Sequence, residues 1–179
     1  MASKKIVDAL NSQINAESYS AYLYLAMSAW ASVAGLKGAA NWYFVQAQEE
    51  MTHAWRFYLY IQKLGQAVEL QAIKQPPVEF KSLKHAFEET LKHEKYITSR
   101  INDLVNLARG EKDHATEVFL QWFVNEQVEE EENDMDILAK LKLAGSEGSG
   151  LFMVDAELAA RMFVMPPDLP GGAAAAAAP

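Results

Sequence analysis

Apolar residues recur every three or four positions along most of the chain, which is the period of a helix that buries one face. The pattern predicts four long helices, at about residues 4–33, 38–64, 82–108 and 113–143. Ser82 is a suitable N-cap for the third, and Gly35 and Gly65 follow the first two, where a glycine commonly ends a helix. Strong strand signals are missing, so the sequence predicts an all-α fold.

The connections between these helices predict how they are arranged. A few residues join the first helix to the second and the third to the fourth, so each pair should form an antiparallel hairpin. The segment 65–81 is longer and contains Pro76 and Pro77. Extended, about 15 residues span up to ~50 Å, whereas a helix of about 27 residues is about 40 Å long. This segment can therefore cross the whole bundle and start the third helix at the end where the second began.

The chain after the fourth helix changes in character. A Gly- and Ser-rich linker at 144–150 precedes a short apolar helix at about 151–165. Such a helix is too short to be stable alone, so it should pack on the bundle or on a neighbour. Residues 166–179 contain Pro170, two glycines and six alanines, and we expect this tail to be disordered. The predicted organisation is one domain at 1–165 followed by the tail.

Composition narrows the possible functions. The 179 residues, half of them apolar, suffice for one domain with a packed core. The absence of cysteine excludes disulfides and thiolate sites, and it favours the cytoplasm weakly. A net charge of −8 makes nucleic acid an unsuitable partner. The sequence shows neither an apolar run long enough to span a membrane nor a signal-peptide stretch at its start, so no membrane association is expected.

An acidic residue interrupts each predicted apolar stripe near its midpoint. The four residues are Glu17, Glu50, Glu94 and Glu130. An ionised carboxylate without a partner in a dry core costs several kcal/mol, so each must be neutralised or bind a cation. For any one of them, a position at the edge of the stripe that reaches water is an equally good explanation. In the predicted topology, however, all four lie at the same level to within about one or two helical turns.

A metal ion would neutralise such a layer, since few lysines or arginines lie in the stripes. Oxygen ligands with one imidazole suit iron or manganese. His53 can supply the imidazole, because it follows Glu50 by three residues and so shares its helix face.

Four sequence blocks resemble those of bacterial and archaeal non-haem ferritins, and the resemblance covers residues 4–165. The blocks are Asn15-Ala-Glu17-Ser-Tyr-Ser, Gln48-Glu-Glu50-Met-Thr-His53, His93-Glu94 and Trp122-Phe-Val-Asn-Glu126-Gln-Val-Glu-Glu130. The resemblance implies a ferritin-like four-helix bundle with one long crossover between the second and third helices and a short fifth C-terminal helix. It also implies iron storage: a ferroxidase that oxidises Fe(II) with O₂ or peroxide and deposits ferric oxyhydroxide inside a homo-oligomeric cage of 24 subunits.

The resemblance also implies roles for individual residues. The first iron would be held by Glu17, Glu50 and His53, and Glu50 would bridge to a second iron held by Glu94 and Glu130. Gln127 would orient solvent or oxygen at the first site.

The resemblance also implies a third iron site and a role for a tyrosine, and for these residues an ordinary structural role is an alternative. A third iron site is implied at Glu49, Glu126 and Glu129 together with Glu130, although a solvated acidic face would explain these residues too. Tyr24 matches a tyrosine near the iron pair, and a packed core aromatic is nearly as good an explanation.

Departures from related families define the alternatives. Gln127-x-x-Glu130 stands where bacterioferritins, which bind haem between subunits, carry a second Glu-x-x-His. Met51 falls at their haem-ligating position, but without the second histidine we interpret it as core packing and expect no haem. A di-iron oxidase or peroxidase of the rubrerythrin kind is the main alternative function. A purely structural helical bundle without metal is the third.

Overall fold

The structure, a computed structural model, describes residues 2–145 and 147–172. Within them it contains five helices and no strand: α1 (Lys4–Val33), α2 (Lys37–Lys63), α3 (Leu83–Gly110), α4 (His114–Ala144) and α5 (Ser149–Leu158). The four long helices confirm the predicted ranges to within two residues at each end. The backbone N–H of His85 donates to Ser82 Oγ (3.1 Å), which confirms the predicted cap of α3.

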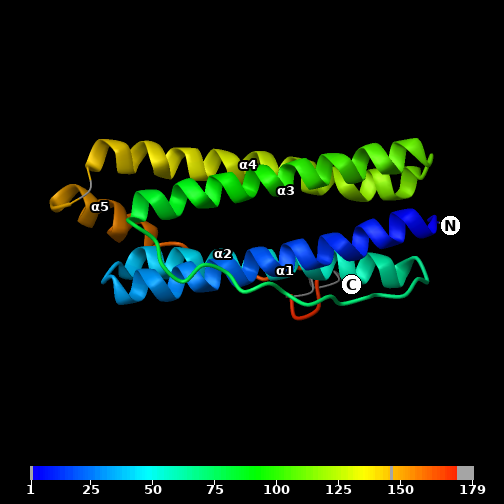
Figure 1. The fold of residues 1–179 in the computed structure, drawn as a ribbon, viewed down its shortest axis with the longest axis horizontal. Helices are drawn as coiled ribbons and strands as arrows, with labels where there is room; N and C mark the ends of the chain where they lie inside the picture. Colours follow the sequence, from blue (N-terminus) through cyan, green and yellow to red (C-terminus); the bar gives the residue numbers. More distant parts are fainter. Residues whose placement is uncertain (1, 146, 173–179) are drawn as a thin grey trace, which may run out of the picture.

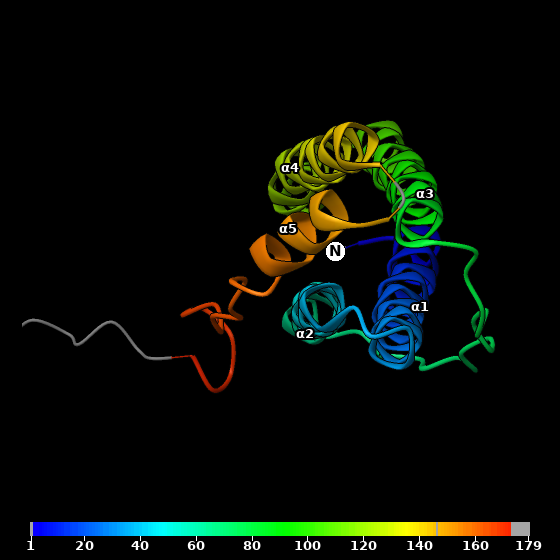
Figure 2. The ribbon, with the colours of Figure 1, turned by 90° about the vertical axis from the view of Figure 1, so that its left-hand side faces the viewer.

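The arrangement of the helices confirms the predicted crossover. In Figure 1, α1 and α2 form one antiparallel hairpin and α3 and α4 form another. The connection between α2 and α3 runs back along the whole bundle, so α3 starts at the end where α2 started. Figure 2 shows α5 at that end of the bundle, where it contacts α2 and α4. None of the described helices is long and apolar enough to cross a membrane.

The apolar core is divided into two clusters with a polar layer between them. The cluster nearer α5 includes Trp42, Tyr43 and Phe87. The cluster at the other end includes Leu10, Phe57, Ile97 and Phe123, among other residues. The residues of the four long helices between these clusters are buried and polar: Glu17, Ser20, Glu50, Thr52, His53, Thr90, Glu94, Gln127, Glu130 and Asp134.

A side chain of α5 caps the first turn of α2. The Asp155 carboxylate accepts hydrogen bonds from the backbone N–H groups of Gly38 (3.1 Å) and Ala39 (2.8 Å). The helices approach so closely here that a Cβ on Gly38 would lie 1.6 Å from the carbonyl oxygen of Asp155. Glycine is therefore needed at residue 38 for α5 to dock.

Removing this cap should loosen α5. Because loss of a helix cap costs about 1 kcal/mol, we expect Asp155→Ala to lower the melting temperature of the metal-free protein by about 2–4 °C. Gly38→Ala should lower it further, since the added methyl group overlaps backbone. Glu157→Ala is the control, because Glu157 lies on the same helix but makes only an exposed pair with Lys140. Equal melting of all four proteins would show that the contact does not stabilise the fold.

The end of α5 differs from the sequence prediction. The helix stops at Leu158 rather than near residue 165. The Asn41 side chain donates to the carbonyls of Ala159 (3.3 Å) and Arg161 (2.9 Å), so these carbonyls are satisfied without further helix.

The start of the predicted tail lies against the bundle in this structure. Residues 166–172 turn back onto the bundle, where Leu169 is buried and Asp168 pairs with Arg56. Glycine and proline content does not predict that a single charged residue meets a partner, and disorder of the tail stays a prediction. The remainder of that tail, 173–179, lies outside the described residues.

Candidate metal centre

The four midpoint glutamates lie in the polar layer, one on each long helix. Glu17, Glu50, Glu94 and Glu130 are at most 5% exposed. His53 lies one turn from Glu50 on α2 and is equally buried. None of the four carboxylates therefore reaches water at the edge of its stripe.

His53 lies between two groups of carboxylates. Its Nδ1 is 3.7 Å from Glu50 Oε2, and its Nε2 is 3.7 Å from Glu126 Oε1. Potential ligand atoms of Glu17, Glu50 and His53 all lie within 4.8 Å of one another, and so do those of His53, Glu126 and Glu130. Each group is compact enough to hold one ion.

Glu94 is held from two sides. The Tyr24 hydroxyl donates to its Oε1, and Gln127 Nε2 donates to its Oε2 (3.2 Å) and to its backbone carbonyl (3.3 Å). Tyr24 and Gln127 are thus both brought to the centre, and in this structure both position Glu94.

Two buried glutamines outside the four motif blocks organise the glutamates. Gln46 Nε2 donates to Glu50 Oε1 (3.3 Å) and to Glu130 Oε2 (2.9 Å), and so links α2 to α4. Gln46 precedes Glu50 by four residues, so its place on the inward face was visible in the sequence. Its partner on α4 was not.

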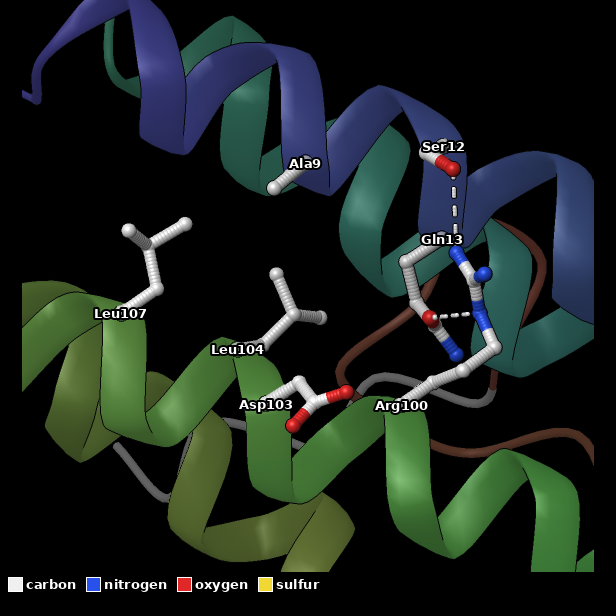
Figure 3. Close-up of a pocket in the computed structure, with 7 residues that line it drawn as sticks. All are labelled: Ala9, Ser12, Gln13, Arg100, Asp103, Leu104 and Leu107. Atoms are coloured by element: carbon white, nitrogen blue, oxygen red, sulfur yellow. Dashed lines mark hydrogen bonds between the residues drawn. The ribbon is translucent and has the colours of Figure 1, made fainter.

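The second glutamine connects the centre to a surface arginine. Gln13 Nε2 donates to Glu17 Oε1 (2.7 Å), and Gln13 Oε1 accepts from Arg100 Nε (2.9 Å). Arg100 also donates to Ser12 Oγ (3.0 Å), and Figure 3 shows both of its contacts from α3 to α1. Because the guanidinium fixes the amide oxygen, the amide NH₂ of Gln13 is oriented toward Glu17.

The buried carboxyl groups hold protons more tightly than usual. Burial, followed by repulsion from Glu50, raises the pKa of Glu17 to about 8 and that of Glu130 to about 7. The same causes raise the pKa of Glu94 well above its usual range. Burial opposes protonation of His53, but Glu50, Glu126 and Glu17 outweigh it and raise the pKa of His53.

These residues fit a bound cation. Glu17 Oε2 is buried and has no hydrogen-bond partner, which is costly unless an ion or a proton occupies the site. Carboxylate oxygens with one imidazole suit iron or manganese. A cation would offset the repulsion that raises the carboxyl pKa values.

The three additional acids of the implied third site are placed differently from one another. Glu126 lies beside His53, as described above. The Glu49 carboxylate pairs with Arg161, whose guanidinium carbon lies 4.4 Å from the centre of the Trp42 ring. Glu129 is exposed. The structure thus brings Glu126 to the centre and shows Glu49 engaged by a cation of the chain itself.

Comparison with known proteins identifies relatives over most of the chain. The family model described as Ferritin-like domain matches residues 7–144. A bacterial non-heme ferritin from Campylobacter jejuni is 46% identical over 155 residues, which cover 87% of this chain and 93% of that protein.

Two solved structures are also similar. The open-pore ferritin of the archaeon Archaeoglobus fulgidus is 48% identical, with a TM-score of 0.89 and coverage of 90% of this chain and 100% of that one. Its engineered closed form has the same identity, a TM-score of 0.90 and coverage of 92% and 100%. The family match over most of the chain, the identity to these relatives and the shared fold together show that this chain belongs to the ferritin family.

Proposed function

We propose that this protein stores iron by oxidising Fe(II) at the polar layer and depositing ferric oxyhydroxide inside an oligomeric cage, built from 24 copies of the chain. The observation that carries the proposal is the buried layer of four glutamates, one from each long helix, in which Glu17, Glu50 and Glu130 lie close to the His53 imidazole. Such a concentration of carboxylate in a protein core is unfavourable without cations. The relatives named as ferritins support the storage role.

The proposed chemistry uses two Fe(II) ions as substrate. Glu17, Glu50 and His53 hold the first, Glu94 and Glu130 hold the second, and Glu50 bridges them. Each Fe(II) gives up one electron, so the pair reduces one O₂ to hydrogen peroxide with uptake of two protons, or one hydrogen peroxide to two water molecules with uptake of two protons. Tyr24 and Gln127 keep the Glu94 carboxylate oriented toward the pair through the hydrogen bonds described above.

The two positions differ in a way that suits storage. The first includes an imidazole, whereas the second is proposed to have carboxylates alone, so it should retain Fe(III) less firmly. Product that leaves the second position clears the site for new Fe(II). A permanent di-iron cofactor would need both positions to bind Fe(III) tightly.

A third position at Glu49, Glu126, Glu129 and Glu130 is proposed to bind iron after it leaves the iron pair. Arg161 occupies the Glu49 carboxylate, so the arginine and the metal would compete for the same oxygens. A partly exposed ion pair contributes about 1 kcal/mol, and a metal that binds Glu49 must break it. Arg161→Gln removes this competition, so it should bind the third metal roughly fivefold more tightly. Anaerobic Fe(II) titration measures this, with Arg109→Gln, which breaks an exposed pair with Glu117, as the control. Unchanged affinity in Arg161→Gln would argue against Glu49 as a ligand.

The storage proposal as a whole is tested by size-exclusion chromatography after aerobic loading with Fe(II), with iron measured in each fraction. Many iron atoms per chain that co-elute with a particle of several hundred kilodaltons are expected. About two irons per chain on a small oligomer would favour a rubrerythrin-like oxidase instead. A protein that binds no iron would favour the purely structural bundle.

A further inference from the structure

A second layer of buried oxygen atoms lies one helical turn from the proposed iron pair, on the side toward α5. Asp134 follows Glu130 by four residues on α4, and Gln46 precedes Glu50 by four residues on α2. Because α2 and α4 run in opposite directions, both steps lead to the same level of the bundle (Figure 1). Asp134 and Gln46 are each only 1% exposed.

One oxygen of each side chain lacks a partner. Asp134 Oδ2 and Gln46 Oε1 are buried and accept no hydrogen bond from any described group. The orientation of Gln46 is fixed, since its Nε2 donates to both Glu50 and Glu130 and leaves the amide oxygen free. Two unsatisfied acceptors at one level of a core cost several kcal/mol together unless something positive lies between them.

None of the described groups around Asp134 makes an ion pair with it. The nearby carboxylates Glu130, Glu50 and Glu131 repel it. Arg161 attracts it, but the Arg161 guanidinium pairs with Glu49 through Nη2, its buried Nη1 has no hydrogen-bond partner, and it makes no ion pair with Asp134. The Asp134 charge contributes to the raised pKa of Tyr43, but the Tyr43 hydroxyl makes its hydrogen bond with Thr90 Oγ1 (3.2 Å).

We propose that Asp134 Oδ2 and Gln46 Oε1, together with the Glu130 carboxylate, hold a further hard cation next to the iron pair. We call this the Asp134 position. It lies on the opposite side of Glu130 from Glu126 along α4, so it differs from the third site considered above. Its ligands are a carboxylate, an amide oxygen and a shared glutamate, which suit Fe(II) and Fe(III) and include no soft donor.

The position has a role in storage that rests on the proposed function. Glu130 is a proposed ligand of the second, less firm iron. An ion can therefore pass from the second position to the Asp134 position without losing Glu130. This gives iron a route toward the α5 end of the bundle that does not use Glu49 or Glu126.

A protonated Asp134 is the competing explanation. An Asp134 carboxylic acid that donates to Gln46 Oε1 would satisfy both side chains without a metal. The two explanations differ in metal content, because only the first predicts an ion that disappears when the Asp134 charge is removed.

The experiment compares the assembled wild-type protein with Asp134→Asn, which keeps the shape of the side chain but removes its charge. Asp136→Asn is the matched control, since it makes the same change at an exposed position two residues away on α4. Anaerobic Fe(II) binding is counted in solution, and crystals soaked anaerobically in Fe(II) are measured at the iron absorption edge. We expect an anomalous peak within coordination distance of Asp134 and Gln46 in the wild type and in Asp136→Asn. Asp134→Asn should lack this peak and bind one Fe(II) fewer per chain, with the peaks of the iron pair retained.

Each other outcome is decisive. Peaks at the iron pair with none at Asp134 would overturn this inference and leave the proposed function intact, and so would equal Fe(II) counts in wild type and Asp134→Asn. A peak at Asp134 with none at the pair would support this inference and overturn the proposed function. No ordered iron in any soaked crystal would overturn both. Thermal melting of metal-free Asp134→Asn is the folding control, and it should occur near the wild-type temperature because asparagine has nearly the same size and shape.

Discussion

The Glu50→Gln variant should lose Fe(II) oxidation by on the order of 100-fold or more, while its metal-free form melts at a higher temperature than the wild type. Glu50 is the proposed bridge between the two irons, and its side chain contacts both Gln46 and His53. Glutamine keeps its length and its acceptor oxygen but not its charge. Changes to residues that only support metal ligands already cost about 10–100-fold, so a bridging ligand should cost at least as much.

The gain in stability follows from the same charge. Glu50 repels Glu17, Glu94 and Glu130 in the metal-free protein and raises the pKa of each. Removing it relieves three repulsions and sacrifices one attraction to His53. We expect a net gain on the order of 1–2 kcal/mol, or roughly 2–8 °C in melting temperature.

Stopped-flow absorbance of Fe(III) formation and calorimetry of the chelated protein measure the two effects. Glu132→Gln is the control, because Glu132 is an exposed glutamate on α4 and should change neither. Loss of activity together with loss of stability would mean misfolding rather than a missing ligand. Full activity in Glu50→Gln would exclude the proposed centre.

The metal-free protein should also lose stability as the pH rises from about 5 to about 8, opposite to the usual behaviour of carboxylates in ion pairs. The pKa of Glu17 is raised from 4.5 to about 8 and that of Asp134 from 3.8 to about 8, mainly by burial. The pKa of Glu130 is raised to about 7. Each group therefore binds its proton more tightly in the folded than in the unfolded chain.

The sign of the pH dependence follows directly. Between the unfolded and folded pKa values the folded state carries more protons, so stability falls as pH rises through that window. His53 acts in the same direction, since its raised pKa means that a stabilising protonated form is lost at high pH. For a single carboxyl, a rise from 4.5 to about 8 corresponds to a penalty of about 5 kcal/mol, or roughly 10 °C or more in melting temperature.

Calorimetry of the chelated protein at about pH 5.5 and about pH 8, with and without added Zn(II), tests this prediction. Zn(II) should stabilise the protein most at the higher pH, because ligands must be deprotonated to bind a metal. Glu17→Gln should flatten the pH dependence, whereas Glu88→Gln, at an exposed position on α3, should leave it unchanged. A metal-free protein that is more stable at the higher pH would show that the polar layer is not protonated as we infer.

The sequence by itself determined the four long helices, their hairpins and crossover, and the level of the glutamate layer. It could do so because helical periodicity specifies which face of a segment is buried, and loop length specifies which helices are antiparallel neighbours. Glu17, Glu50, Glu94 and Glu130 were recognisable since each interrupts an apolar stripe. His53 was recognisable from its spacing to Glu50.

Only the tertiary structure decided which polar groups meet across the bundle. Periodicity places Gln13, Gln46 and Asp134 on inward faces, but it does not say that Gln46 links Glu50 to Glu130 or that Asp134 has no partner. The contact between Arg161 and Glu49 depends on where the chain turns after α5, which local pattern does not encode. A helix face is a property of neighbouring residues in the sequence, whereas a hydrogen-bond or ion-pair partner depends on how whole helices pack.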